Sequence, residues 1–222
     1  LLTPGLSKGA KLGKTGIPAT IVSKYLWERG LVVEKTGLYS FLILFSLGIT
    51  RGKWSTMLAA LPAFKSDYDA NAPLAKTLPS IAAAGGRAYA GWGLRDLCDA
   101  LHGCYRDNDT AAAMNAMYTE LPEPAMKPAD AYDHLVHGRV EPVAIDELKG
   151  RVAAVMIVPY PPGIPLIMPG ERFSTDSIVE YLKFARDTDD RFPGFESDIH
   201  GLRFDIDAQT GHKHWLVDCV KE

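Results

Sequence analysis

Helical spacing of apolar side chains is the first pattern along the chain. Residues 17–29 place apolar side chains on one helical face, with Pro18 in the first turn and Gly30 where a helix would stop. The same spacing predicts further helices over residues 54–68, 94–106, 110–121, 128–136 and 173–187. We expect Ser174 to cap the last of these helices. We expect Pro62 to kink or interrupt the second helix, because proline lacks an amide N–H and crowds the preceding turn.

Runs of β-branched and aromatic residues predict strands between and after these helices. Residues 31–36 and 40–47 lie on either side of Gly37, so we expect neighbouring strands, and 40–47 is apolar enough for burial on both faces. Further strands, the last two forming a hairpin, are predicted over residues 151–158, 202–206 and 214–220. Because these strands follow a block of helices instead of alternating with them, the pattern favours an α+β fold.

A proline-containing loop divides the chain into two parts. A loop that contains Ala72-Pro73 and then Leu78-Pro79 follows the first helices and strands. Loops of this composition are common places for domain boundaries. We therefore expect one domain over residues 1–72 and a second over residues 73–222.

Composition narrows the classes of protein that fit. The 222 residues are 47% hydrophobic, 23% charged and 9% aromatic, which is typical of a globular protein and excludes a disordered chain. A formal net charge of -3 leaves no overall positive field for a nucleic acid or an anionic membrane. The longest apolar run, residues 41–45, is far shorter than the roughly 20 residues that cross a bilayer. We therefore expect no nucleic acid and no membrane as partners.

The N-terminal segment and the cysteines bear on where the protein works. Residues 1–16 lack the continuous apolar stretch of a signal peptide. The three cysteines, Cys98, Cys104 and Cys219, cannot all pair within the chain, so we expect free thiols in a reducing, cytoplasmic compartment. The chain begins with Leu1 rather than Met, in the middle of a strand-like phrase, and we expect it to be a fragment of something longer.

Two clusters of chemically active residues have simple structural explanations. The segment from Gly9 to Thr15 has three residues between its glycines where a phosphate-binding loop has four, so a solvated basic loop is favoured. Cys98, His102 and Cys104 are close in sequence, but a tetrahedral zinc site would need a fourth ligand that no second spaced pair supplies. We interpret them as packing thiols and a surface histidine, and we predict no metal site.

Two other segments carry stronger signals. Residues 159–171 place five prolines and two glycines between a predicted strand and a predicted helix, which describes a rigid buried connection because each proline restricts the backbone. Architecture alone could account for this, but the same rigidity would hold the Tyr160 phenol in place for a substrate pocket. Glu34 is a carboxylate inside a strand pattern, and the pattern by itself favours a solvent-facing position.

Five strings of residues together resemble one enzyme family. They are the 159–171 string, which is highly specific, and Leu2-Thr3-Pro4-Gly5, Gly16-Ile17-Pro18-Ala19-Thr20, Glu34-Lys35-Thr36-Gly37 and Phe192-Pro193-Gly194-Phe195-Glu196-Ser197-Asp198-Ile199-His200-Gly201. In their order along the chain, and covering essentially all of it, these strings closely resemble the bacterial ornithine/lysine/arginine decarboxylases of fold-type I.

The resemblance implies that this chain is the C-terminal third of a longer enzyme. The family's wing domain and large domain, which binds pyridoxal phosphate, would lie upstream. Residues 1–72 would be the small α+β subdomain of the pyridoxal-phosphate core, and residues 73–222 the family's C-terminal α+β domain. Active sites of the family form at a dimer interface, so we expect a homo-oligomer that is a dimer or is built from dimers.

The chemistry of the family places the reacting groups elsewhere. Pyridoxal phosphate would supply the electron sink for decarboxylation, and the protein a Schiff-base lysine that follows Ser-x-His. Thr210-Gly211-His212-Lys213 mimics that phrase, but the family's lysine lies well upstream of the segment at Gly16. We therefore assign no catalytic residue to this chain, leave its cofactor-binding residues unknown, and expect it to be inactive alone.

The resemblance also implies a substrate-binding role for Glu34, in addition to the role that rigidity suggests for Tyr160. In the lysine and ornithine members, the glutamate matching Glu34 would neutralise the distal cation of the basic amino acid substrate. Residues 49–54 and 69–75 look more like the arginine branch. We favour lysine or ornithine, because Glu34 would take part in substrate binding, whereas those two segments form a loop and a linker. The alternative is a non-catalytic α+β module that binds a small cation or mediates dimerisation.

Overall fold

A computed structural model describes residues 1–7, 9, 11–160, 163–209, 211 and 213–221. Contacts divide the chain into two compact units, Leu1–Ala111 with Asp189–Glu196, and Ala112–Thr188 with Ser197–Glu222. Both helices and antiparallel strands are present, so the predicted α+β class is confirmed. Among the described residues, no helix combines the length and the apolar character that a membrane crossing requires.

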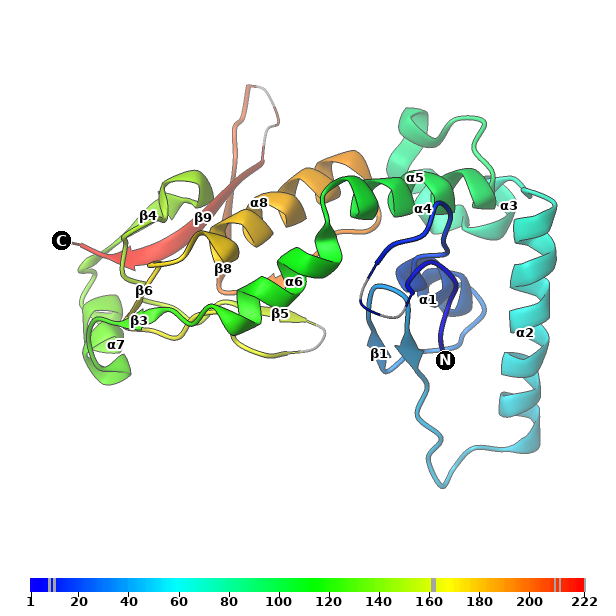
Figure 1. Cartoon of the computed structure of the whole chain (residues 1–222), viewed down its shortest axis with the longest axis horizontal. Helices are drawn as coiled ribbons and strands as arrows, with labels where there is room; N and C mark the ends of the chain where they lie inside the picture. Colours follow the sequence, from blue (N-terminus) through cyan, green and yellow to red (C-terminus); the bar gives the residue numbers. More distant parts are fainter. Residues whose placement is uncertain (8, 10, 161–162, 210, 212, 222) are drawn as a thin grey trace. The chain divides into compact units, whose positions relative to one another are not determined.

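The first unit is mainly helical (Figure 1). Its elements are helix α1 (Ala19–Trp27), strands β1 (Lys35–Thr36) and β2 (Phe41–Leu42), helices α2 (Arg51–Asp69), α3 (Leu74–Thr77) and α4 (Pro79–Gly85), the 3-10 helix η1 (Gly86–Tyr89) and helix α5 (Leu94–Asp107). Strands β1 and β2 form a short antiparallel pair. The predicted helices over 17–29 and 94–106 are confirmed as α1 and α5.

Tyr25 joins helices α1 and α2. Its ring is fully buried and meets the Phe64 ring edge-on at a centroid distance of 5.0 Å, while its hydroxyl donates to the Asp67 carboxylate at 2.8 Å. Arg29 lies over the Tyr25 ring, with its guanidinium carbon 3.3 Å from the ring centroid. Helix α2 runs through Pro62 without a break, so the expected interruption does not occur.

The two strands predicted in the first unit are much shorter than expected. Only 35–36 and 41–42 form regular strands, with one further bridge between Ser40 and Leu2, and the prediction that 40–47 is buried on both faces is wrong. Phe41 is buried, but Leu42, Leu44, Phe45 and Leu47 are exposed. These apolar side chains lie on the surface because no other segment of the described unit covers them.

The second unit is built around a small antiparallel sheet. Its elements are helix α6 (Thr110–Thr119), strand β3 (Glu123–Pro124), helix α7 (Pro128–Val136), strand β4 (Val140–Ala144), the 3-10 helix η2 (Ile145–Glu147), strands β5 (Val158–Tyr160) and β6 (Glu171–Arg172), helix α8 (Asp176–Arg191), and strands β7 (Asp198–His200), β8 (Leu202–Ile206) and β9 (Lys213–Val220). The predictions of α6, α7, α8 and the terminal hairpin are confirmed.

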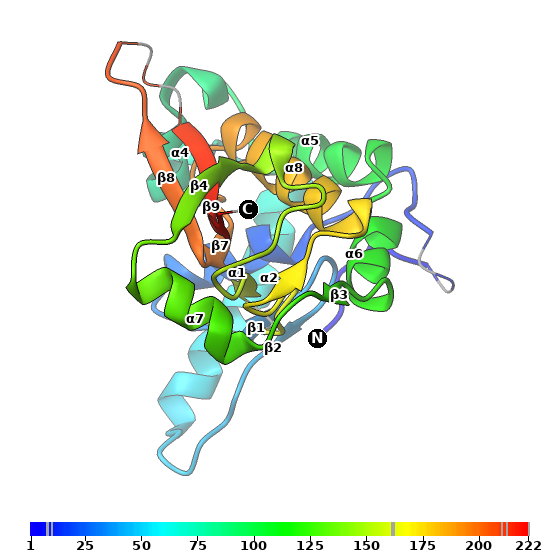
Figure 2. The same ribbon diagram turned by 90° about the vertical axis from the view of Figure 1, so that its left-hand side faces the viewer.

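Strand β9 lies at the centre of the sheet, between β4 and β8 (Figure 2). Its buried side chains, Trp215 and Val217 among them, pack in one core with Ile178 and Leu182 of α8. This packing explains why apolar residues recur at helical spacing in α8 and at every second position in β9.

Two local expectations in this unit are corrected. The strand predicted over 151–158 begins regular pairing only at Val158, because the chain bends at Ala154 and Val155. Ser174 does not cap α8, because this helix begins at Asp176. The Ser174 hydroxyl instead accepts a hydrogen bond from the Glu123 amide at 3.1 Å.

The expected domain boundary at Ala72-Pro73 falls within the first compact unit. The Leu94 amide donates to the Ala72 carbonyl at 2.9 Å, and the Leu74 amide donates to the Trp92 carbonyl at 3.0 Å. These bonds tie the linker to the start of α5, so the contacts divide the chain near Ala111 instead. The assignment of residues 1–72 and 73–222 to two family domains stays a prediction.

Candidate functional site

Two of the sequence strings meet in the second unit. Strand β5 from the proline-rich string pairs with β7 from the 192–201 string, and Tyr160 is the direct partner of Asp198. Side chains alternate between the faces of a strand pair, so Tyr160, Asp198 and His200 share one face. All three are exposed, whereas Pro159 and Ile199 on the other face are buried. We call these three residues the β5–β7 face.

The β5–β7 face brings together three kinds of polar side chain. His200 Nε2 lies 3.3 Å from Asp198 Oδ1, and the rings of Tyr160 and His200 have centroids 6.2 Å apart. Sequence reasoning selected Tyr160 but not Asp198 or His200. The alternation of Asp198, buried Ile199 and His200 is the signal of a half-buried strand that would have found them.

The backbone at Gly201 fixes where β7 ends. Its φ of +90° is a conformation that side chains rarely adopt, and a Cβ at this position would collide with the Met156 carbonyl oxygen. Residue 201 therefore has to be glycine for the chain to pass this close to Met156. The glycine that ends the 192–201 string thus supports the position of His200 beside it.

The proline-rich string is only partly buried. Pro161 and Pro162 lie outside the described residues. The Leu166 amide donates to the Ile157 carbonyl at 2.9 Å, and the Ile157 amide donates to the Ile167 carbonyl at 3.1 Å, which buries Leu166 and Ile167. Residues 163–165 are exposed, so the expectation of a buried connection is wrong there.

Glu34 lies in the first unit, just before β1. Its amide donates to the Leu42 carbonyl at 2.9 Å, and its side chain is exposed. Glu34 and Tyr160 belong to different compact units, and the structure does not bring them together within either one. Their assignment to the substrate stays a prediction.

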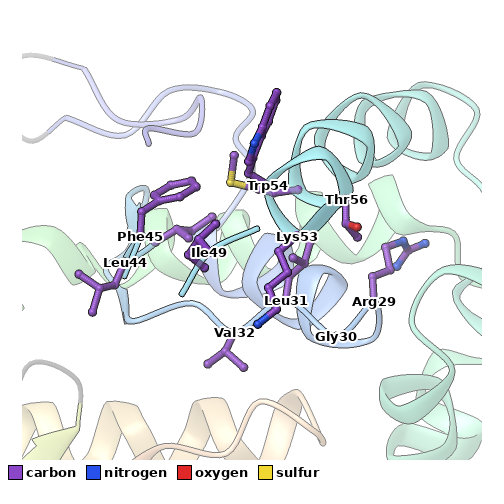
Figure 3. A pocket seen from close by; sticks show the side chains of 12 residues that line it. Arg29, Gly30, Leu31, Val32, Leu44, Phe45, Ile49, Lys53, Trp54 and Thr56 are labelled. Carbon is purple, nitrogen blue, oxygen red and sulfur yellow. The ribbon is translucent and has the colours of Figure 1, made fainter. Parts of the chain in front are cut away.

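The first unit contains a pocket of about 490 Å³. One of its lining residues, Val32, is close to Glu34 in the sequence. Its lining comes from three segments, residues 29–32, the exposed 43–49 loop and the start of α2 (Figure 3). Most of the lining is apolar, and its cations are Arg29 and Lys53. Because no carboxylate or histidine of the described chain lines it, this pocket suits an apolar group and not a basic amino acid.

His102 is buried, which corrects its interpretation as a surface histidine. Its Nε2 lies 2.9 Å from the Gly13 carbonyl and its Nδ1 lies 2.5 Å from the Tyr39 hydroxyl. A carbonyl only accepts, so Nε2 donates to Gly13 and the Tyr39 hydroxyl donates to Nδ1. A Cβ at Gly16 would collide with the His102 ring, so the Gly16 string is explained by packing.

The cysteines beside His102 behave as packing groups, as predicted. Cys98 and Cys104 are buried and free, and burial raises the pKa of the Cys98 thiol, which keeps it in the unreactive thiol form. Over the part of the chain that the structure describes, no three His, Cys, Asp or Glu side chains are grouped closely enough to hold a metal ion.

The described residues do not fit a complete pyridoxal-phosphate site. A Schiff-base lysine needs a buried setting that lowers its pKa, and no lysine in the described ranges is buried. Lys213 packs its ammonium on the Phe204 ring, 3.9 Å from the centroid. In the Ser-x-His-like string that precedes it, Thr210 and His212 lie outside the described residues. The absence of a catalytic lysine from this chain stays a prediction.

Comparison with known proteins connects these features to one class of enzyme. Residues 111–221 match the family model for the "Orn/Lys/Arg decarboxylase, C-terminal domain", and residues 1–53 match the model for the "Orn/Lys/Arg decarboxylase, major domain". The chain therefore belongs to the Orn/Lys/Arg decarboxylase family.

Individual relatives align over the whole chain. The lysine decarboxylase LdcA of Pseudomonas aeruginosa is 64% identical over 100% of this chain and 30% of its own length. The biodegradative arginine decarboxylase of Escherichia coli K12 is 39% identical over 100% of this chain and 29% of its own length. The chain thus spans about 30% of the length of the curated relatives it matches.

A solved structure gives the same picture of the fold. The structure of lysine decarboxylase A from Pseudomonas aeruginosa superposes with a TM-score of 0.92 at 63% identity, covering 100% of this chain and 30% of that one. The α+β arrangement described above is therefore that of a family member.

Proposed function

We propose that this chain is the C-terminal part of a longer, pyridoxal-phosphate-dependent decarboxylase of basic amino acids. The longer protein would release carbon dioxide and leave a diamine from lysine or ornithine, or agmatine from arginine. One observation carries the proposal, namely the 64% identity to a lysine decarboxylase over the whole chain. The additional length of that relative is consistent with upstream domains that hold the cofactor.

Lysine is the substrate we propose first, followed by ornithine and then arginine. The identity to a lysine decarboxylase, 64%, is well above the 39% identity to an arginine decarboxylase. Glu34, which the resemblance assigns to the lysine and ornithine members, supports the same order.

This chain would contribute recognition of the substrate. Pyridoxal phosphate, when bound, supplies the electron sink for loss of carbon dioxide. Glu34 would hold the distal cation of the amino acid through a charge-assisted hydrogen bond, and so fix the distance between that cation and the reacting end. Tyr160 would present its phenol ring as one wall of the substrate site.

We also propose that the longer protein is a cytoplasmic homo-oligomer built from dimers. The exposed apolar side chains of the 42–47 segment and the pocket beside it support this, since large exposed apolar patches commonly mark surfaces that another protein surface covers. Sedimentation of the longer protein tests the assembly, with a dimer or a multiple of dimers expected. A monomer at micromolar concentration would contradict it.

An assay of the longer protein tests the proposed function. The protein is supplied with pyridoxal phosphate and lysine, ornithine or arginine in turn, and both carbon dioxide and the amine product are measured. We expect the highest kcat/KM with lysine. Failure to decarboxylate any of the three would contradict the proposal and favour a non-catalytic module that binds a cation or mediates dimerisation.

A further inference from the structure

We infer that the β5–β7 face, formed by Tyr160, Asp198 and His200, is a cation-binding surface for the ammonium or guanidinium group of the basic amino acid. The inference rests on the proposed function and extends it, because it adds Asp198 and His200 to the residues that recognise the substrate. It concerns a different unit of the chain from Glu34.

The first argument is the state of the Asp198 carboxylate. Several acidic side chains of the second unit have cationic partners within that unit, namely Glu141 with Arg151, Asp146 with Arg186, Asp176 with Lys149 and Asp218 with Arg203, while others, such as Asp205, are exposed without an ion pair in the described ranges. Asp198 contacts His200, and within the described ranges no lysine or arginine forms an ion pair with it. Its negative charge is therefore available to a cation from outside the unit.

The second argument is the aromatic ring directly opposite. Side chains of direct partners in an antiparallel pair have their Cβ atoms about 4.5–5.5 Å apart. The register therefore fixes the Tyr160 phenol ring next to the Asp198 carboxylate. An aromatic face beside a carboxylate attracts alkylammonium and guanidinium groups through both the ring quadrupole and the charge.

The third argument is that the backbone holds these groups in place. Gly201 ends β7 against the Met156 carbonyl, and a Cβ at Gly163 would lie 3.0 Å from the Tyr160 ring, so Gly163 packs directly on that ring. Buried Pro159 restricts the backbone next to Tyr160. A cation that binds this face would therefore meet a preorganised arrangement.

Exposed apolar side chains close to β5 in the sequence favour a ligand with an alkyl chain. Met156 and Met168 are partly exposed, at 42% and 39%, and the antiparallel bridge of Ile157 with Ile167 brings them next to each other. Ile164 is also exposed beside the turn. A methylene chain that ends in a cation matches this combination of apolar and acidic surface better than an inorganic cation does.

The test compares Asp198→Asn with the wild type in the longer enzyme. We expect KM for lysine to rise roughly fivefold or more while kcat changes by less than twofold, because the face acts on the substrate's ground-state cation. The inhibition constant of pentane-1,5-diamine, which carries the cations but no reacting carboxylate, should rise by a similar factor. Asp198→Glu should restore most of both values.

Two controls separate recognition from folding. Asp205→Asn removes an exposed carboxylate from β8, opposite His214, and should leave KM unchanged. Tyr160→Leu removes the aromatic ring without touching the charge, and should raise KM for lysine as well. Thermal unfolding of each variant is measured, and Asp198 is exposed enough that Asp198→Asn should unfold at the wild-type temperature.

The outcomes distinguish this inference from the proposed function. An active wild type whose KM and diamine inhibition stay within twofold in both Asp198→Asn and Tyr160→Leu would overturn the inference alone. A wild type inactive towards lysine, ornithine and arginine would overturn the proposed function and the inference with it. A rise in KM in Asp205→Asn equal to that in Asp198→Asn would also overturn the inference, because it would show a general effect of surface charge.

Discussion

Tyr160 lies directly opposite Asp198 in the antiparallel pair of β5 and β7. Each residue belongs to a different sequence string of the family, so the structure explains both strings by one local arrangement. Gly163 follows Tyr160 with a positive φ, and Gly201 allows the chain to leave β7 against Met156. The two strings therefore form one surface, on which the inference of a cation-binding face depends.

Alkaline pH should destabilise the first unit through its buried tyrosines. Burial, with help at Tyr25 from the hydrogen bond to Asp67, raises the pKa of both Tyr25 and Tyr39 from 10.0 to about 12. Between these values the unfolded chain loses protons that the folded chain keeps, so stability is full below pH 10 and falls as the pH rises towards 12. At pH 11 each of these tyrosines should lower the free energy of unfolding by about 1.4 kcal/mol.

Urea unfolding at pH 8 and pH 11 measures this loss. Tyr39→Phe removes one of these ionisations and should reduce the loss between the two pH values by about 1.4 kcal/mol. Tyr132→Phe is the matched control, because Tyr132 is 63% exposed, and should leave the loss unchanged. Equal pH dependence in all three proteins would contradict the assignment of a raised pKa to Tyr39.

The chain on its own should self-associate through its exposed apolar strip, Leu42, Leu44, Phe45, Leu47, Trp54 and Leu58. In the longer protein we expect another surface, of the upstream domains or of a second subunit, to cover this strip. Sedimentation velocity at increasing concentration should show growing species, and Leu47→Asp should reduce them.

Leu121→Asp serves as the control for that experiment. Leu121 is 76% exposed in the second unit and lies away from the strip in sequence. We expect this variant to self-associate like the unchanged chain. A monodisperse monomer at high concentration in the unchanged chain would be evidence against the strip as an uncovered surface.

The isolated chain should also be inactive. No lysine in its described ranges is buried, so none has the setting that a cofactor-linked lysine needs. After mixing with pyridoxal phosphate and desalting, the chain should retain no visible absorbance band, and it should release no carbon dioxide from lysine. A retained band together with decarboxylation would mean that this chain holds the catalytic lysine after all.

Local patterns predicted the elements whose burial depends on their own unit. The apolar spacing of Ile21, Val22 and Tyr25 gave helix α1, and the alternation in 214–220 gave strand β9, because both pack against segments within the same compact unit. The 40–47 run failed for the opposite reason. Its apolar side chains resemble a core strand, yet the described chain contains nothing that covers them.

Long-range contacts account for the buried histidine and the strand neighbours that the local patterns did not predict. His102 is buried because Tyr39 and Gly13 reach it from other segments. Asp198 gains its neighbour Tyr160 through the register of two strands that are distant in sequence. Neither contact leaves a local signal, although the strings that contain Tyr160 and Asp198 were both visible in the sequence.

Glu34→Gln in the longer enzyme tests whether this chain recognises the substrate's distal cation. The substitution keeps the shape of the side chain and removes its charge. A charge-assisted hydrogen bond contributes roughly 1.5–3 kcal/mol, so kcat/KM for lysine should fall roughly ten- to hundredfold. The absorbance of the bound cofactor should not change, and KM should carry much of the loss because the cation anchors the substrate before and during reaction.

Glu120→Gln, which alters an exposed glutamate just after α6, is the control and should leave the kinetics unchanged. The measurement is kcat/KM of the wild type and both variants with lysine, ornithine and arginine. The account predicts a tenfold or greater loss with lysine in Glu34→Gln alone. A change of less than about twofold with all three amino acids, as expected for a solvated strand residue, would contradict it.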